Sequence, residues 1–358
     1  MNIQTQRFID RWAGQLLCGA VSGWVKLTGM FGAPARMPAA PKNILVILLS
    51  EMGSIVLAGP MFAALRRQYP GAAIHILQLK KNQEVSKLLS LTDVAHMHTL
   101  DDSSGASLIS DILKVSLQMR RIGLDAVIDC ELFSRVSALL SFSTGAPVRV
   151  GFTPHTQEGL YRGSFINHSI PYNPYQHISK QFLSLVDALQ SPEAMPRNRA
   201  GAIREIPSEP ELSVPFSADE LRSYRQKVEA DHPVTANRAL ELVYAGGGIL
   251  PERAWPASHY ARVVQGLCNA GYAVGLIGLK DDAVLARDLK TQVGSEACID
   301  LTGYTRSIRE LLAAIAALQP DGIILTPPHS DNPQIVAFLA GQNIPFVRIG
   351  EAITLRAG

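Results

Sequence analysis

The sequence predicts an α/β protein with two doubly wound, Rossmann-like domains that face each other across a cleft, preceded by an amphipathic N-terminal helix. Apolar runs suit strands that are buried on both faces of a parallel sheet. Helical patterns alternate with these runs. The length of 358 residues suits two domains of roughly 150 residues each. Ligands of such proteins bind at the carboxyl ends of the strands, in clefts between domains.

The composition narrows the class of protein. Hydrophobic residues make up 47% and charged residues 18%, which suits two packed cores. The formal net charge of +2 gives no indication of a nucleic-acid partner. The four cysteines are far apart and form no CxxC pair, which indicates neither a zinc site nor a disulfide framework. We expect buried thiols at Cys130 and Cys268 and a reducing, cytoplasmic compartment.

Residues 1–42 are predicted to form a separate amphipathic helix followed by a Pro-containing linker. The uncharged stretch between Arg11 and Lys26 is shorter than the roughly 20 apolar residues of a spanning helix. Aromatic residues with flanking cations suit a helix that lies on an anionic membrane surface, here the inner face of the cytoplasmic membrane. Two other interpretations remain open: packing against the protein's own core, and a signal peptide with a cleavage site at Ala33-Pro-Ala35.

The first domain is predicted over residues 43–205. Its first strand, 44–49, stops at a Gly-containing loop, and a helical pattern follows from about residue 56. The further expected elements are strands 73–79, 126–129 and 148–152, and helices 108–122 and 131–142.

Residues 206–238 are polar and are predicted to link the domains, and residues 239–358 form the second domain. The expected elements there are strands 239–244, 273–277, 322–325 and 345–349, and helices 260–270, 307–318 and 333–340.

A resemblance to a known family rests on several phrases whose order and spacing agree across residues 43–350. These are Ile44-Leu-Val-Ile-Leu-Leu-Ser-Glu-Met-Gly53, Pro60 with Leu65–Pro70, Asp125–Asp129, Ser134-Arg135, Arg149–Phe152, Glu252-Arg-Ala-Trp-Pro256, Asp300-Leu-Thr-Gly303, Leu311-Leu312 and Pro333–Gly341. Together they resemble glycosyltransferase family 9, the heptosyltransferases of lipopolysaccharide core assembly. The resemblance implies a GT-B fold, an ADP-sugar or similar donor in the second domain, and a lipid-linked saccharide acceptor in the first.

The chain departs from the family pattern in three places. Ser54 stands where the resemblance implies a catalytic Asp. Ser330-Asp-Asn-Pro-Gln-Ile335 replaces the family's Asp-Ser-Gly-Pro-x-His donor motif. The chain also stops at Gly358, whereas the family continues into further helices, which suggests a truncated chain.

Two carboxylates are candidates for the base that inverting sugar transfer needs to deprotonate the acceptor hydroxyl. Glu51 follows the first strand, and Glu131 follows the strand that ends at Asp129 and is expected to open a helix. The competing interpretations are a solvated loop charge for Glu51 and a helix-start carboxylate for Glu131. Asp129 itself is interpreted as structural.

The donor candidates lie in the second domain and would bind the nucleotide diphosphate through backbone N–H groups, hydroxyls and one cation. They are Gly246, Gly247, Gly248, Arg253, Thr326, Ser330, Asp331 and Asn332. A flexible turn at the glycines and simple N-capping at Asp331 or Asn332 are the structural alternatives. No GxGxxG pattern appears there, which disfavours a nicotinamide enzyme.

The acceptor candidates lie in the first domain and carry hydrogen-bonding groups. They are Ser54, Arg135, His168, Tyr172 and His177, with the last three in a stretch expected to be a loop. An ion pair with Glu131 is the alternative for Arg135.

We therefore expect an inverting, metal-independent glycosyltransferase that uses a nucleotide-sugar, with ADP-sugar favoured, and no other cofactor. Its expected partners are a lipid-linked saccharide and the inner membrane surface. The alternatives are a non-catalytic homologue that serves as a binding or scaffold subunit in envelope polysaccharide assembly, and a nucleotide-sugar epimerase of the same fold.

Overall fold

The computed structural model describes residues 10–28, 36–49, 52–155, 160–190, 216–246, 255–278, 280–318, 323–325 and 346–348. The chain divides into two compact units, Met1–Val214 and Pro215–Gly358. Within these described residues, each unit holds its own parallel sheet, six-stranded in unit 1 and five-stranded in unit 2.

Unit 1 begins with a short π-helical turn, Asp10–Gly14, which continues into α2, Gln15–Leu27. The α/β part then follows as β1 Asn43–Ile47, α3 Met52–Leu57, α4 Gly59–Gln68, β2 Ala73–Leu79, α5 Gln83–Leu88, β3 Met97–Leu100, α6 Gly105–Ile122, β4 Ala126–Asp129, α7 Arg135–Ser143, β5 Val148–Phe152, β6 His168–Ile170 and α8 Ile178–Ala188.

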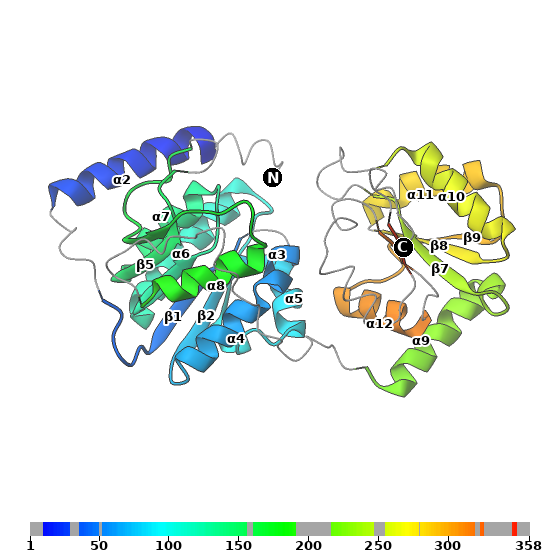
Figure 1. Cartoon of the computed structure of the whole chain (residues 1–358), viewed down its shortest axis with the longest axis horizontal. Coiled ribbons are helices and arrows are strands. Elements are labelled where there is room, and N and C mark those ends of the chain that lie inside the picture. The colour runs from blue at the N-terminus through cyan, green and yellow to red at the C-terminus, as the bar shows by residue number, and fades with distance from the viewer. Residues whose placement is uncertain are drawn as a thin grey trace, which may run out of the picture. The chain divides into compact units, whose positions relative to one another are not determined.

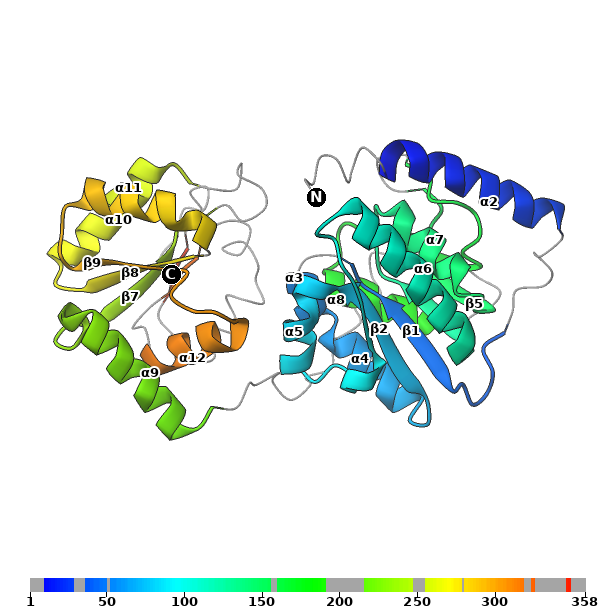
Figure 2. The same ribbon diagram turned by 180° about the vertical axis from the view of Figure 1, so that it is seen from behind.

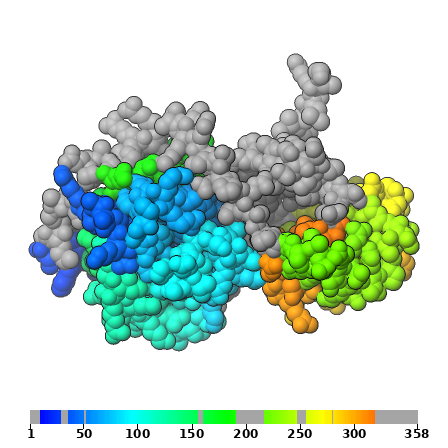
Figure 3. Space-filling view, turned by 90° about the horizontal axis from the view of Figure 1, so that it is seen from below, coloured from blue at the N-terminus to red at the C-terminus, as the bar shows by residue number. Residues whose placement is uncertain are grey.

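The six strands of unit 1 are all parallel, in the order β3-β2-β1-β4-β5-β6. Alternate residues of β1 point to opposite faces, and all of Ile44–Ile47 are fully buried. Leu45 and Ile47 belong to a core cluster with residues of α6 and α7. Helices α4 and α8 pack together, and Figures 1 and 2 show α8 and α6 on opposite faces of the sheet. The space-filling view likewise separates α8, in green, from α6, in teal (Figure 3).

Helix α2 packs on α7 through one face (Figure 1), and its bulky side chains are exposed on the other. The buried residues are small or medium in size: Gly14, Cys18, Ser22 and Val25. The exposed face carries Trp12, Leu16, Leu17, Trp24 and Leu27, which are between 53% and 89% exposed. The segment thus packs on its own domain and also presents an apolar outer face. Within the described residues, no helix is long and apolar enough to cross a membrane.

Unit 2 contains α9 Ala218–Asp231, β7 Leu240–Tyr244, α10 Ala257–Asn269, β8 Ala273–Gly278, α11 Ala283–Val293, β9 Cys298–Thr302, α12 Ile308–Leu318, β10 Ile323–Leu325 and β11 Phe346–Arg348. Its parallel sheet has the order β11-β10-β7-β8-β9. Helix α9 lies in the segment expected to be a linker, and it packs on α12. Only Val228 of this helix is buried, and the polar sequence that results is why the segment resembles a linker.

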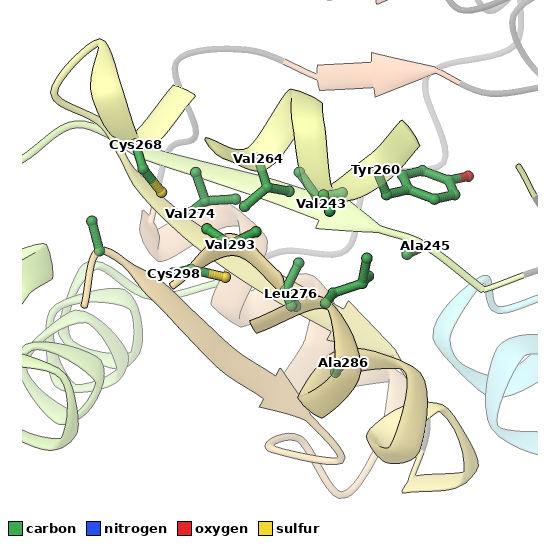
Figure 4. Close-up of a cluster of buried hydrophobic side chains, with 13 residues drawn as sticks. Val243, Ala245, Tyr260, Val264, Cys268, Val274, Leu276, Ala286, Val293 and Cys298 are labelled. Atoms are coloured by element: carbon green, nitrogen blue, oxygen red, sulfur yellow. The ribbon is translucent and has the colours of Figure 1, made fainter. Parts of the chain in front are cut away.

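The core of unit 2 lies on both faces of this sheet. Val264 of α10 and Leu289 of α11 pack with Val274 and Leu276 on one face (Figure 4). On the other face, Val228 and Leu318 pack against Leu240 and Ile299. Cys130 and Cys268 are buried thiols, as the sequence predicts, and Cys18 and Cys298 are buried and free as well.

Candidate active site

The strand order of unit 1 defines a switch point between β1 and β4. Strands β2 and β3 lie on one side of this pair, and β5 and β6 lie on the other. In open α/β sheets the crevice beyond the carboxyl ends of such a strand pair is the preferred ligand site. The residues that follow β1 and β4 are therefore expected to line a ligand site.

Glu131 lies at this switch point. Its Oε1 accepts a hydrogen bond of 2.7 Å from the backbone N–H of Leu49, just beyond β1. Its own N–H donates to Oδ1 of Asp129 at 3.1 Å. The expectation that Glu131 opens a helix is wrong, because α7 begins at Arg135 with Ser134 as its N-cap. The carboxylate accepts a hydrogen bond from the backbone just beyond the neighbouring strand.

Asp129, at the end of β4, is fully buried and is a structural residue. Its Oδ2 accepts a hydrogen bond of 2.7 Å from the guanidinium of Arg162 and one of 3.1 Å from the hydroxyl of Ser137. Arg162 also donates from Nε to the backbone carbonyl of Ser134 at 3.0 Å. Burial raises the pKa of Asp129, while Arg162 acts in the opposite direction. This ion pair holds the 131–134 loop, which connects β4 with α7.

Cys130 lies between these two carboxylates and is not a nucleophile. Burial, together with the negative charges of Asp129 and Glu131, raises the pKa of its thiol well above the usual range. A protonated thiol in such surroundings is unreactive.

Arg135 begins α7 and pairs with Asp10 of the N-terminal segment. One guanidinium nitrogen lies 3.3 Å from Oδ2 of Asp10, and Nε donates to the backbone carbonyl of Tyr161 at 2.7 Å. The arginine side chain is 2% exposed. The expected contact of Arg135 with an acceptor anion therefore requires its surroundings to open, and the ion pair that the structure gives it is with Asp10.

The other acceptor candidates lie on three different elements. Ser54 is half-buried in α3, so the Gly-containing segment after β1 is partly helical and not a plain loop. Tyr172 follows β6 and packs edge-on against Phe152, with ring centroids 5.5 Å apart. His177 caps α8 by accepting a hydrogen bond from the N–H of Ser179 at 3.3 Å.

His168 is buried at the start of β6, and its Nδ1 lies 2.8 Å from the carbonyl oxygen of Ala188. The expectation of a loop is therefore wrong at His168, which begins β6, whereas Tyr172 and His177 lie in the loop between β6 and α8. The polar residues of this stretch misled the prediction, since their side chains bond to the backbone of neighbouring elements.

The switch point of unit 2 lies between β7 and β10. Gly246 follows β7, and a Cβ at this position would lie 2.6 Å from the hydroxyl oxygen of Tyr244. Glycine thus permits the close approach of the chain to this ring. The remaining donor candidates and one catalytic candidate lie outside the described residues: Glu51, Gly247, Gly248, Arg253, Thr326, Ser330, Asp331 and Asn332.

Two residues of the site were missed by the sequence analysis as functional contributors. Arg162 lies 33 residues from Asp129 and Asp10 lies 125 residues from Arg135, so no local pattern connects them. The only local signal is at Arg162, a lone charge among uncharged residues, whereas Asp10 lies beside Arg11 and carries no such signal. Among the described residues, no three His, Cys, Asp or Glu side chains are grouped so that they could hold a metal ion.

The fold is shared with solved structures of glycosyltransferases. The structure of a family 9 glycosyl transferase from Veillonella parvula matches with a TM-score of 0.63 at 19% identity, over 88% of this chain and 82% of that one. The structure of ADP-heptose lps heptosyltransferase II from E. coli matches with a TM-score of 0.60 at 19% identity, over 86% and 84%. These likenesses establish the GT-B fold that the sequence predicts.

The profile of glycosyltransferase family 9 (heptosyltransferase) matches residues 112–320, and the chain belongs to this family. Lipooligosaccharide heptosyltransferase 2 of Haemophilus ducreyi is 23% identical over 270 residues, which cover 74% of this chain and 72% of that protein. The matched range includes Glu131 and most of unit 2. The resemblance drawn from the sequence is therefore confirmed, and the protein is a glycosyltransferase.

Proposed function

We propose that this protein transfers a heptose-like sugar, with inversion, from a nucleotide-sugar to the core of lipopolysaccharide or another lipid-linked envelope saccharide. Membership of family 9 supports the reaction class. The relative from H. ducreyi and the E. coli structure are named as heptosyltransferases, and the latter as one that uses ADP-heptose, which favours an ADP-sugar donor.

The observation that carries the proposal is the carboxylate of Glu131 at the switch point of unit 1. Its Oε1 is 2.7 Å from the N–H of Leu49, which fixes its direction. As the acceptor hydroxyl oxygen attacks the anomeric carbon, a carboxylate in this position takes up the hydroxyl proton. The nucleoside diphosphate leaves from the opposite side of the sugar, so the anomeric configuration inverts.

The donor half of the site is proposed in unit 2. Backbone N–H groups near Gly246 would approach the diphosphate, and Arg253 would supply a positive charge that offsets the charge of the leaving group. Thr326 and the segment 330–332 would complete this wall. No metal is required in this scheme.

The outer face of α2 is proposed to rest on the inner surface of the cytoplasmic membrane. Trp24 and the three leucines of α2 are exposed, as is Trp12 in the turn before it, and the exposed cations Arg11 and Lys26 lie at the two ends of this face. Apolar and aromatic side chains that are flanked by cations bind anionic bilayers from one side. Such attachment would hold the enzyme beside a lipid-linked acceptor.

Ser54, in place of the family's Asp, favours the non-catalytic scaffold as a second candidate. A panel of ADP-, GDP-, UDP- and dTDP-sugars, tested by thermal shift, separates the two. A donor at a hundred times its dissociation constant should stabilise the protein by about 2.7 kcal/mol, and Arg253→Ala should abolish the shift. A donor shift followed by sugar transfer supports the enzyme, and product analysis distinguishes it from an epimerase. The absence of any shift would favour the scaffold.

Flotation with vesicles that contain anionic phospholipid tests the membrane proposal. Trp12→Ala with Trp24→Ala should reduce the bound fraction several-fold. Leu113→Ala on α6 is the matched control, since Leu113 is 61% exposed and thus as accessible as the tryptophans. Equal losses for both variants would contradict a specific role for α2.

A further inference from the structure

The N-terminal segment supplies a hydrogen-bond acceptor for the first backbone N–H groups of α7. One carboxylate oxygen of Asp10, Oδ1, accepts hydrogen bonds from the backbone N–H groups of Arg135 at 2.9 Å and Val136 at 3.1 Å. The next N–H, that of Ser137, donates to the hydroxyl of Ser134 at 3.2 Å. The first N–H groups of a helix have no partner within it and are stabilised by such acceptors. A residue that lies 125 positions earlier thus shares the capping of α7.

The start of α7 is also the end of the 131–134 loop, which carries Glu131. This short loop is held at three points: by Asp129 at the N–H of Glu131, by Arg162 at the carbonyl of Ser134, and by Asp10 at Arg135. The Glu131 carboxylate in turn bonds to the N–H of Leu49. A continuous series of hydrogen bonds and short chain segments therefore runs from Asp10 to the end of β1.

Packing of the helix itself provides two further contacts. Gly14 lies against Arg135, and a Cβ there would be 2.9 Å from Cβ and 3.0 Å from Cδ of that side chain. Ser22 accepts hydrogen bonds from the hydroxyl of Tyr161 at 2.7 Å and from the N–H of Ser164 at 3.0 Å. The carbonyl of Tyr161 accepts from Arg135, so these contacts converge on the arginine that Asp10 holds.

We propose that Asp10 is a positioning residue for the Glu131 carboxylate, so that the N-terminal segment orders the acceptor side of the site as well as lying on the membrane. This rests on the proposed function, in which Glu131 is the base. Asp10 acts through the start of α7 and the 131–134 loop. The N-terminal segment is then part of the catalytic domain, and its contribution persists with a water-soluble acceptor.

The experiment compares wild type with Asp10→Ala and Asp10→Asn, and uses Asp219→Asn, an exposed carboxylate of α9, as the control. Two quantities are measured: kcat and KM with a delipidated, soluble acceptor, and hydrogen exchange of the Leu49 amide by NMR. Asp10→Ala should lower kcat about tenfold to a hundredfold, because small displacements of a reacting group are costly. It should also accelerate exchange at Leu49 severalfold, while the KM for the donor stays unchanged.

Asp10→Asn should be intermediate, since an amide oxygen still caps a helix but leaves Arg135 without its counter-charge. A second pair of variants leaves the Asp10 carboxylate that caps α7 unchanged. Gly14→Ala should displace Arg135 and, like Asp10→Ala, accelerate hydrogen exchange of the Leu49 amide. Gly19→Ala, with nothing within 4 Å of the new Cβ, should behave as wild type in both measurements.

Wild-type kcat in Asp10→Ala would overturn the proposal, whatever happens at Leu49. A lower kcat with unchanged exchange at Leu49 would also overturn it, because the effect would then not pass through Glu131. If wild type transfers no sugar from any donor, the proposed function fails by itself. The exchange of the Leu49 amide then decides alone whether Asp10 positions Glu131.

Discussion

The two units share a doubly wound plan, but their switch points differ in what occupies them. At the carboxyl ends of β1 and β4 in unit 1, charged side chains form hydrogen bonds. Glu131 accepts one from the N–H of Leu49, and Arg162 pairs with buried Asp129. Beside β7 of unit 2, Gly246 lies against the partly exposed Tyr244. Among the described residues, the first switch point thus holds fixed charges, and the second holds a glycine beside an aromatic ring. Positioned charges are typical of proton transfer, whereas glycine allows close approach to the backbone.

The largest expected difference concerns the buried ion pair of unit 1. Arg162→Met leaves Asp129 buried without its partner, which should lower the free energy of unfolding of unit 1 by about 3–5 kcal/mol. Arg309→Met in unit 2 removes a partly exposed pair with Glu220 and should cost about 1 kcal/mol or less. Urea unfolding of the two variants checks this. Equal losses of unfolding free energy in the two variants would contradict a larger contribution from the buried pair.

Acid should affect unit 1 through His75, which is buried in β2 beside His96, His98 and Asn43. Burial, then the charges of His96 and His98, lowers the pKa of His75 from 6.5 to about 4. The unfolded chain therefore binds more protons between pH 6.5 and 4, and stability falls as the pH drops through this window. The loss is up to about 3 kcal/mol.

Urea midpoints measured from pH 7 to pH 4 test this expectation. His75→Gln should flatten the slope, because its amide does not titrate. The same pH slope in wild type and His75→Gln would exclude His75 as the cause.

Glu131→Gln tests the chemical role of the first switch point. The amide oxygen still accepts the hydrogen bond from Leu49 but no longer takes up a proton, so kcat should fall about 10²–10⁴-fold. The thermal shift given by the donor should remain unchanged. Glu229→Gln, on the surface of α9, is the control and should keep wild-type kcat. Full activity of Glu131→Gln would transfer the role of base to Glu51.

Gly246→Ala tests the second switch point. The new Cβ would meet the ring of Tyr244, and because this residue is 41% exposed, the ring should move toward solvent at a small cost in stability. The displaced ring and the added methyl group should weaken donor binding by about tenfold, or about 1.4 kcal/mol. Gly266→Ala on α10, with open space around the new Cβ, should leave donor affinity unchanged. Titration calorimetry with the donor compares the two variants.

Continuous apolar runs were sufficient to predict much of the fold. Strands β2, β4 and β5 have the predicted bounds, because each is a run that is buried on both faces. Strands β3, β6 and β9 were not predicted, since His98, His168 and Asp300 interrupt their apolar character. The buried imidazoles are partnered in space by residues that no local pattern identifies.

The candidate site was predictable only in part. Glu131 was found because it follows a buried strand, which is a local signal. Its contact with Leu49 depends on the pairing of β1 with β4, and the capping of α7 by Asp10 depends on tertiary packing. Such contacts between distant positions are set by how the elements pack.

The docking of α2 on Arg135, Tyr161 and Ser164 has a consequence for the newly made chain. The helix leaves the ribosome before its partners, which are synthesised more than a hundred residues later. At the usual rate of about 5–20 residues per second, this interval is on the order of ten seconds. During that time both the inner face and the outer face of the helix are uncovered. The nascent chain therefore has an early opportunity to meet a bilayer or a chaperone before its own domain has been made.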